Sequence, residues 1–345
     1  MNHFKTSKLI SEIFSNKITN KKILSYKNID WDKVVKITSA HLSLPALYSK
    51  LNKRNILHIL PSKLKKYLKN IYDLNLNRNK KILNQLNSLN NLLIDNEISF
   101  CYLKGSSTLI INLYNDLGSR MIGDIDILVS PNDYIKTINI LNNNGYNANS
   151  LEIINFKKLK KNHRHYPRLI NKKFICAVEI HNKYLNNEIY YLKTNNILSN
   201  KIFKKKYPIM NFEHMIYYNI LNFFINDKGS EGIYNLKNIY ETIELKKKLN
   251  KNLILINKKE ININFSIYNI FLKEFKYDKN LYTYFYRSRL LLFFKFNFLF
   301  KIKKLLFFII KLPILFFKKK NKNTLLINTN KKIKNYFHII NEDFQ

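Results

Sequence analysis

Two acidic residues inside a strongly apolar segment are the part of this sequence best suited to chemistry. Asp124 and Asp126 stand two residues apart in Asp124–Val129 (DIDILV), a pattern typical of a buried strand. Side chains at this spacing face the same way on a strand, so both carboxylates should project from one face. Such a pair is costly to desolvate unless a cation neutralises it. Because Mg²⁺ prefers oxygen ligands and serves phosphoryl transfer, the pair predicts a metal site.

A turn upstream of this pair offers groups that suit a phosphate. The sequence predicts a short strand over Ile98–Leu103 and an apolar helix from Gly105 to about Tyr114. Free backbone N–H groups at a helix start bind anions, and glycine lets the backbone approach a ligand closely. Ser106 or Ser107 could cap this helix or donate to a phosphate. A plain helix cap and a solvated strand end remain the alternative interpretations of the turn and of the acid pair.

The order of these elements resembles the nucleotidyltransferase core of the DNA-polymerase-β superfamily. More closely, the chain is similar to a bacterial family of uncharacterised nucleotidyltransferases, whose members carry Leu-Lys-Gly, Arg-x-x-Gly-Asp-Ile-Asp-Leu-Leu-Val and Val-Glu-Ile-His motifs. The matching segments here are Leu103–Gly105, Arg120–Val129 and Val178–His181. The resemblance implies an α+β fold in which a small mixed sheet with flanking helices lies between N- and C-terminal helical regions.

The resemblance also implies an active site with three acidic residues. The superfamily pattern carries a third carboxylate on a later strand, and Glu179 stands in that role. Asp124, Asp126 and Glu179 are then the expected catalytic residues and the ligands of two Mg²⁺ ions. Glu179 would also help to deprotonate the attacking hydroxyl group.

The expected nucleotide-binding residues follow from the turn and its neighbours. Lys104 and Arg120 are plausible cationic helpers, although either could instead pair with nearby acids. The full set consists of Lys104, Gly105, Ser106, Ser107 and Arg120.

The resulting hypothesis is a Mg²⁺-dependent enzyme that moves a nucleoside monophosphate from a nucleoside triphosphate to a hydroxyl acceptor and releases pyrophosphate. The acceptor could be a small molecule, tRNA or protein. One alternative is a toxin-like nucleotidyltransferase that acts on tRNA or protein. Another is a non-catalytic protein that binds a membrane surface.

Composition favours a globular protein with an unusual charge. Hydrophobic residues make up 46% and aromatic residues 14% of the 345 residues, which excludes a disordered chain. Lys and Arg number 60 against 23 Asp and Glu, for a net charge of +37. This excess suits a polyanionic partner such as tRNA or an anionic membrane. Compositional drift is the alternative, because Lys, Asn and Ile are abundant in every segment.

The cysteines and the N-terminus point to a reducing compartment. Cys101 and Cys176 lie in predicted core strands without metal-ligand spacing, so we expect buried free thiols. The N-terminal sequence has no long apolar segment typical of a secretory signal. We therefore expect a cytoplasmic protein, with membrane association left open.

We expect four regions along the chain. Residues 1–97 form a helical lobe, 98–195 the nucleotidyltransferase core, 196–285 a second helical lobe and 286–345 a basic, aromatic segment. In the first lobe, Asp30 should cap a helix and a long helix should span about Pro61–Asp95. Trp31 and His41 are interpreted as packing residues.

The sequence after the acid pair predicts further elements. Ser130–Asp133 should start a helix that ends at Asn144–Tyr146, and a strand is expected near Ser150–Phe156. The basic segment Lys157–Arg168 follows. Its His163, Arg164, His165 and Arg168 side chains could reach a triphosphate, or the segment could be a solvated hairpin loop.

The last third of the chain is helical by prediction. Phe212–Phe224 and Ile233–Leu249 should form helices; His214 resembles a recurrent family histidine, whereas Asn238 stands where members often have Asp. Charges interrupt the apolar residues of 290–320, which argues against a spanning helix. A helix on a membrane surface, giving peripheral contact, and a helix that closes the core are both consistent with this segment.

Overall fold

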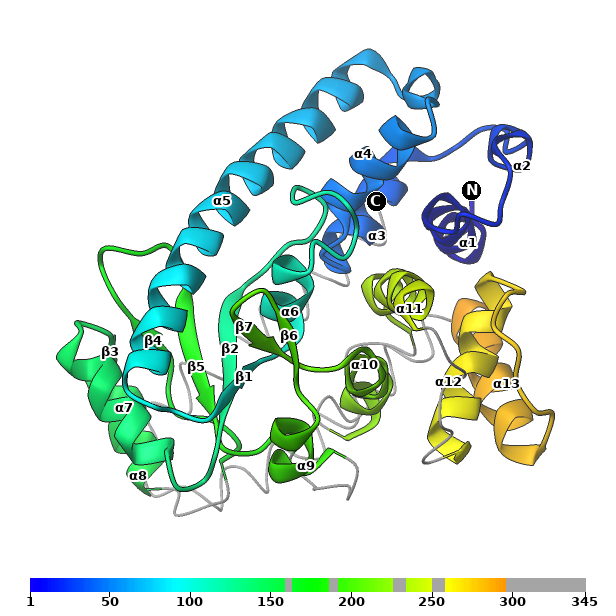
Figure 1. The fold of residues 1–345 in the computed structure, drawn as a ribbon. Helices are drawn as coiled ribbons and strands as arrows, with labels where there is room; N and C mark the ends of the chain where they lie inside the picture. Colours follow the sequence, from blue (N-terminus) through cyan, green and yellow to red (C-terminus); the bar gives the residue numbers. More distant parts are fainter. Residues whose placement is uncertain (159–162, 186–191, 226–233, 250–257, 296–345) are drawn as a thin grey trace, which may run out of the picture. The chain divides into compact units, whose positions relative to one another are not determined.

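The computed structural model describes residues 1–158, 163–185, 192–225, 234–249 and 258–295 (Figure 1). The chain divides into two compact units, Met1–Arg287 and Ser288–Gln345. The finer division into four regions stays a prediction.

The N-terminal part of the first unit is helical, as the sequence predicts. Its helices are α1 (His3–Phe14), α2 (Asn20–Leu24), α3 (Trp31–Ala40), α4 (Leu44–Lys53) and α5 (Ser62–Asp95), with a 3-10 turn at Leu57–Ile59. The Asp30 side chain caps α3 by accepting a hydrogen bond from the Lys33 backbone N–H at 2.9 Å. Pro45 lies in the first turn of α4, where its missing N–H costs nothing.

The long helix α5 supports the centre of the molecule with polar side chains. Asn75 Nδ2 donates to the carbonyl oxygens of Gly118 and Arg120 at 2.7 and 2.9 Å. Gln85 bonds both the backbone N–H and the carbonyl of Cys176. These bonds fix the segments that lead into the two central strands, and they satisfy backbone groups that burial would otherwise leave unpaired.

The strands that the structure describes form one seven-stranded mixed sheet. They are β1 (Phe100–Tyr102), β2 (Asp124–Val129), β3 (Asn147–Ala148), β4 (Leu169–Ile170), β5 (Ala177–His181), β6 (Ile202–Lys204) and β7 (Tyr207–Ile209). Their order is β3-β4-β5-β2-β1-β7-β6. Strands β2 and β5 are parallel neighbours, as are β1 and β7, and the other pairs are antiparallel.

Helices follow most strands and complete the unit (Figure 1). They are α6 (Lys104–Ile110), α7 (Tyr134–Asn143), α8 (Ser150–Lys158), α9 (Thr194–Ser199), α10 (Phe212–Ile225), α11 (Leu236–Lys248), α12 (Lys258–Phe271) and α13 (Leu281–Lys295), the last of which crosses into the second unit. The long apolar segments predicted as helices are therefore confirmed in α5, α10 and α11.

The predicted strand near Ser150–Phe156 is wrong, because that segment is helix α8. The Asn149 side chain accepts a hydrogen bond from the Leu151 N–H at 2.9 Å, an arrangement that starts a helix. The strand in this region is β3, which ends at Ala148. A mixed apolar and polar pattern over so few residues does not separate the two states, and the local cap decided between them.

Two predicted helix boundaries also shift. Helix α7 begins at Tyr134 and not at Pro131, since Ser130 and Asp133 hydrogen-bond each other and hold the preceding residues in a turn. Helix α6 ends at Ile110, short of Tyr114, and Asn112 then adopts a left-handed backbone with φ of 46°.

Both cysteines are buried free thiols, as expected. Cys101 lies in β1, and burial raises the pKa of its thiol far above the usual value. Cys176 immediately precedes β5 and is not within the strand.

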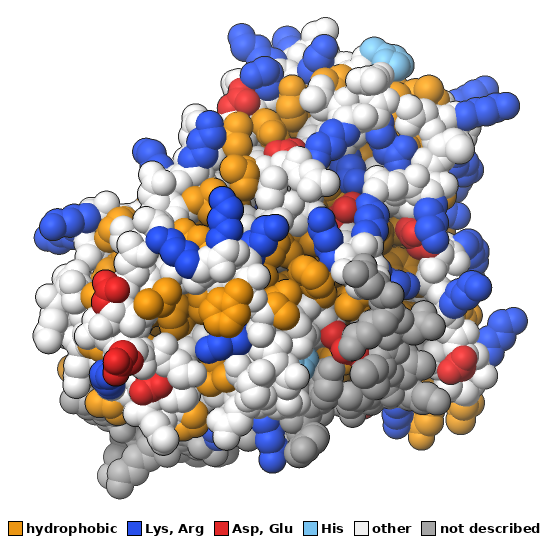
Figure 2. Space-filling view, viewed as in Figure 1, with side chains coloured by type: hydrophobic (Ala, Val, Ile, Leu, Met, Phe, Trp, Pro, Cys, Tyr) orange, Lys and Arg blue, Asp and Glu red, His pale blue; other side chains and the backbone are white. Residues whose placement is uncertain are grey.

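Basic side chains are spread over the visible surface and are not gathered into one patch (Figure 2). Within the described residues, no helix combines the length and the apolarity needed to cross a membrane. Most of the segment 290–320, for which a membrane-surface helix or a core helix was predicted, lies outside the described residues.

Candidate functional site

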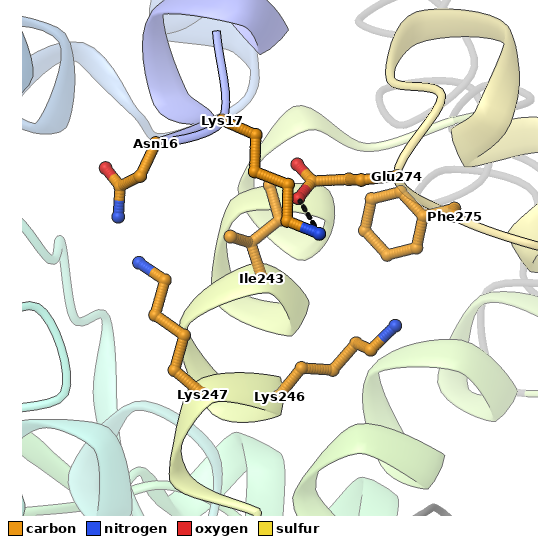
Figure 3. A pocket seen from close by; sticks show the side chains of 7 residues that line it. All are labelled: Asn16, Lys17, Ile243, Lys246, Lys247, Glu274 and Phe275. Carbon is orange, nitrogen blue, oxygen red and sulfur yellow. Dashed lines mark ion pairs between the residues drawn. The ribbon is translucent and has the colours of Figure 1, made fainter.

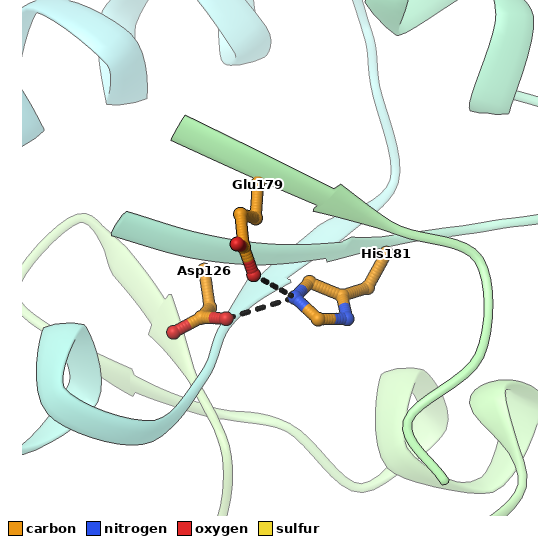
Figure 4. Close-up of side chains that lie close together, drawn as sticks. All are labelled: Asp126, Glu179 and His181. Atoms are coloured by element: carbon orange, nitrogen blue, oxygen red, sulfur yellow. Dashed lines mark hydrogen bonds and ion pairs between the residues drawn. The ribbon is translucent and has the colours of Figure 1, made fainter. Parts of the chain in front are cut away.

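The pairing of β2 with β5 brings acidic residues from distant parts of the chain together. The two strands are parallel, and Asp126 is the register partner of Glu179. Their side chains therefore project from the same face of the sheet, where they point toward each other and toward His181 (Figure 4). We call Asp124, Asp126 and Glu179 the acid cluster.

His181 completes a group of possible metal ligands with two of these acids. Its Nε2 atom lies 2.8 Å from Asp126 Oδ1 and 3.6 Å from Glu179 Oε2. One ligand atom from each of Asp126, Glu179 and His181 lies within 4.8 Å of the others. The three residues expose only 2%, 6% and 0% of their surface. Carboxylates this deeply buried must be compensated by hydrogen bonds or positive charge.

Two cations of the chain provide that compensation. The Lys104 ammonium group forms an ion pair with Asp126 Oδ1. The Arg168 guanidinium bridges two acids: Nε donates to Glu179 Oε1 at 2.9 Å and Nη2 donates to Asp124 Oδ2 at 2.7 Å. Every member of the acid cluster therefore contacts a basic side chain.

These contacts keep the inner two acids ionised. Burial alone raises the pKa of Asp126, but the charge of Lys104 and the hydrogen bond to His181 outweigh it, and the pKa falls below its usual value. For Glu179, burial is likewise outweighed by contacts with His181 and Arg168, which hold its pKa well below the normal range. Both side chains should be carboxylates at neutral pH.

Asp124 occupies the outer edge of the cluster. It is the first residue of β2 and is half-buried, and it lies outside the compact group of ligand atoms that Asp126, Glu179 and His181 form. Burial, followed by the negative charges of Asp126 and Glu179, raises its pKa. The structure thus brings all three predicted acids together, with Asp124 joined to Glu179 through Arg168.

The Lys-Gly-Ser-Ser turn lies beside this cluster and is conformationally strained. Lys104 has a φ of 47°, a conformation that residues other than glycine rarely adopt. The Ser106 hydroxyl is fully buried and makes no hydrogen bond to any described residue. The Ser107 hydroxyl instead donates to the Tyr102 carbonyl. A Cβ atom added to Gly105 would lie 3.3 Å from Ile122, so little room exists for a larger residue.

Arg120 pairs with an acid outside the cluster. Its Nε donates to Glu241 Oε2 on α11 at 3.0 Å, and the same oxygen accepts from the Tyr114 hydroxyl at 3.2 Å. Asn219 on α10 donates to the other oxygen of Glu241 at 3.3 Å. This buried network ties the segment before β2 to the helices, and a nucleotide-binding role for Arg120 stays a prediction.

The described end of the basic segment reaches the acid cluster. Arg168 contacts two of the acids, and the ring of His165 lies 5.1 Å from the ring of His181. The carbonyl of Arg164 accepts hydrogen bonds from the backbone N–H groups of the two residues after His181. Arg168 nonetheless remains 58% exposed, so the segment is both solvated and directed at the site.

The family resemblance also drew attention to His214 and Asn238, which lie on α10 and α11. His214 on α10 is buried, and burial lowers its pKa to about 4. Asn238 on α11 donates to the Asn219 carbonyl at 3.3 Å.

The sequence interpretation missed His181 as a site residue, although a signal was present. His181 follows Glu179 at a spacing of two on a strand, the same spacing that relates Asp124 and Asp126. Residues at this spacing share a face, so one functional side chain predicts its neighbour two positions along.

A second charged region lies among the helices and has the opposite sign. A cavity of about 250 Å³, which we call the lysine pocket, is shown in Figure 3. Its lining consists of Asn16, Lys17, Ile243, Lys246, Lys247, Glu274 and Phe275. Lys17 pairs with Glu274 at 3.8 Å and Lys247 with Glu244 at 2.8 Å. The Lys246 ammonium lies 5.3 Å from the centre of the Phe275 ring.

Comparison with protein families agrees with this geometry. A family model described as "Uncharacterised nucleotidyltransferase" matches residues 27–272, which is well over half of the chain and includes the whole sheet and the acid cluster. No curated protein and no solved structure matches the chain. On the strength of the family match, this chain belongs to the uncharacterised nucleotidyltransferase family.

Proposed function

We propose that this protein is a divalent-metal-dependent nucleotidyltransferase with a polymerase-β-like core. It moves a nucleoside monophosphate from a nucleoside triphosphate to a hydroxyl acceptor and releases pyrophosphate. The observation that carries the proposal is the group of Asp126, Glu179 and His181 ligand atoms within 4.8 Å of one another. This group lies on adjacent strands of a chain that belongs to a nucleotidyltransferase family.

The side chains present fit a divalent cation. Asp126 and Glu179 supply oxygen ligands, the donor type that Mg²⁺ prefers, and the buried His181 imidazole adds a nitrogen that also suits Mn²⁺ or Zn²⁺. Asp124 adds a third carboxylate at the edge of this group. We assign Asp124, Asp126 and Glu179 as the residues that hold the metal, with Mg²⁺ as the first candidate and two ions as the superfamily resemblance implies. A bound divalent ion would offset negative charge on the attacking and leaving oxygens.

The first turn of α6 supplies the nucleotide side of the site. Ser106 is the hydroxyl of this turn that no described residue engages. It is also fully buried, so donation to a phosphate oxygen requires the turn to shift as the triphosphate binds. Lys104 holds Asp126 in its ionised form and adds positive charge where a triphosphate would bind. Gly105 keeps the turn free of a side chain. Ser107 stabilises the turn through its bond to Tyr102.

The reaction is an in-line displacement at the α-phosphorus. The acceptor oxygen forms a bond to phosphorus, the bond to the bridging oxygen of pyrophosphate breaks, and the hydroxyl proton is lost to solvent or to a nearby base. The lowered pKa of Glu179 makes it a weak base at neutral pH, so its environment favours a ligand role over proton removal.

Neutralising the two inner acids tests this assignment. Asp126→Asn and Glu179→Gln should each lower label transfer from a radiolabelled triphosphate by at least roughly 10³-fold, because each removes a charge that the metal requires. Circular dichroism should show an intact fold. Asp73→Asn, the same change at an exposed acid on α5, serves as the control and should retain full activity. Undiminished transfer by both cluster variants would exclude the proposed site.

The class of acceptor can be found with the same assay. Label transfer is measured with tRNA, protein and small hydroxyl compounds offered in turn. With a net charge of +37, binding of tRNA should weaken steeply as salt increases. Binding of a small neutral acceptor should change little over the same range.

A further inference from the structure

Lys104 and Arg168 are paired with the acid cluster in different ways. Asp126 is paired with Lys104, whereas Asp124 and Glu179 share the single guanidinium group of Arg168. Each acid of the cluster therefore contacts a cation of the chain, but two positive charges face three carboxylates and one negative charge is left over. A divalent cation that binds here must displace positive charge or accept close repulsion from it.

The two cations differ in how easily they could leave. The Lys104 side chain is 20% exposed, its partner Asp126 only 3%, and the backbone of Lys104 is held in a left-handed conformation. Removing its ammonium group would strand a buried carboxylate. The Arg168 side chain is 58% exposed, so its guanidinium can be hydrated as soon as it leaves the acids. Its partners are less exposed, at 21% for Asp124 and 8% for Glu179, so another cation must take its place at the acids when it leaves.

Arg168 engages one oxygen of each of two acids that the proposed function assigns to the metal. Its nitrogen atoms lie 2.9 Å from Glu179 Oε1 and 2.7 Å from Asp124 Oδ2, one oxygen from each acid. A guanidinium and a divalent cation are both positive and compete for the lone pairs of the same carboxylates. Bonding of the two acids by one cation also holds their side chains in place while no metal is bound.

We propose that Arg168 is a tethered counter-cation: it bridges Asp124 and Glu179 in the metal-free protein and is displaced when a divalent cation binds to the acid cluster. This inference rests on the proposed function, which assigns the metal to these acids. It makes Arg168 a positioning residue that tunes metal affinity and not a metal ligand.

The backbone around Arg168 keeps the displaced group close to the site. Arg168 immediately precedes β4, and Leu169 pairs with Val178 of β5. The attachment point of the side chain is therefore fixed to the sheet that carries Glu179. A guanidinium released there is well suited to bind a phosphate oxygen of a triphosphate that arrives with the metal.

Metal affinity, measured without any turnover, tests the inference. Mn²⁺ binding to the full-length protein is measured by calorimetry and by electron paramagnetic resonance for wild type, Arg168→Gln and Arg168→Lys. Arg168→Gln should bind Mn²⁺ roughly tenfold more tightly, the scale expected when a competing, solvent-exposed cation is removed from the acids. Arg168→Lys keeps the charge but lacks the forked guanidinium that spans two acids. Its Mn²⁺ affinity should lie between those of wild type and Arg168→Gln.

Lys172→Gln is the matched control. Lys172 is an exposed residue in the turn after β4 with no ion pair to a described acid, so its loss changes the net charge equally without touching the cluster. Its Mn²⁺ affinity should stay within roughly twofold of wild type, because solvent screens the removed charge. The rise in melting temperature on adding Mn²⁺ should likewise be larger for Arg168→Gln than for wild type or the control.

The outcomes separate the inference from the proposed function. Equal or weaker Mn²⁺ binding by Arg168→Gln, together with normal transfer by wild type, would overturn only the role of Arg168. An equal gain in Arg168→Gln and Lys172→Gln would also overturn it, since net charge would then explain the effect. Absence of Mn²⁺ binding in all variants would overturn both. Tighter binding confined to the Arg168 variants supports the inference.

Discussion

The acid cluster and the lysine pocket are both groups of like charge, yet the fold treats them in opposite ways. Asp126 and Glu179 are nearly fully buried and depend on cations from other segments of the chain. Lys246 and Lys247 are exposed, and each has a partner close at hand. The charges of the acids are therefore compensated by contacts that only the tertiary structure creates, whereas the charges of the lysines are compensated by solvent and neighbouring side chains.

The difference shows which charges carry information about function. With 60 basic residues, a surface cavity lined by lysines is expected by composition alone. Only 23 acidic residues are present, and three of them meet on adjacent strands. Burying like charges is unfavourable, so such a group persists only where a compensating interaction or a function requires it.

Removal of the buried cation should have the largest effect on stability. Lys104→Met leaves Asp126 without its ion pair and should lower the free energy of unfolding by about 3–5 kcal/mol, measured by urea denaturation. In the double variant with Asp126→Asn, part of this loss should be recovered, because no unpaired carboxylate remains. Strictly additive effects of the two changes would show that the pair is not coupled.

The dependence of stability on pH should distinguish the contribution of the acid cluster from that of the buried His214. Burial lowers the pKa of His214 to about 4. Between about pH 6.5 and pH 4, this histidine is therefore protonated in the unfolded chain but neutral in the folded chain. Stability should fall by about 3 kcal/mol between pH 7 and pH 4 from this group. The lowered pKa values of Asp126 and Glu179 act in a different window: their contribution is lost only as the pH falls below about 4.

His214→Gln tests this assignment. Denaturation at several pH values should give a flatter profile between pH 6.5 and pH 4 and an unchanged loss below that range. His58→Gln, at an exposed histidine, is the control and should leave the profile as in wild type. A wild-type slope in His214→Gln would assign the loss to other groups.

The lysine pocket should give the smallest effect. Lys246→Met removes an exposed ammonium group that contacts the rings of Phe265 and Phe275, and the free energy of unfolding should change by less than about 1 kcal/mol. Nucleotidyl transfer should be unaffected. A large loss of transfer would mean that the pocket takes part in the reaction, and the contrast with the acid cluster would fail.

Local signals in the sequence were sufficient for much of the fold. The Asp30 cap, the long apolar face of α5 and the buried strand β2 depend on neighbours a few residues away, and all three predictions are confirmed. The segment Ser150–Phe156 was assigned wrongly because its pattern suits either state, and a single side-chain cap selected the helix.

The sequence by itself determined that Asp124 and Asp126 share one face of a strand, because the period of a strand is a local property. It did not determine which strand would lie next to theirs, nor that His181 and Arg168 would meet the acids. Those contacts join residues far apart in the chain. Only the register of β2 against β5, and the need to neutralise buried carboxylates, decided them.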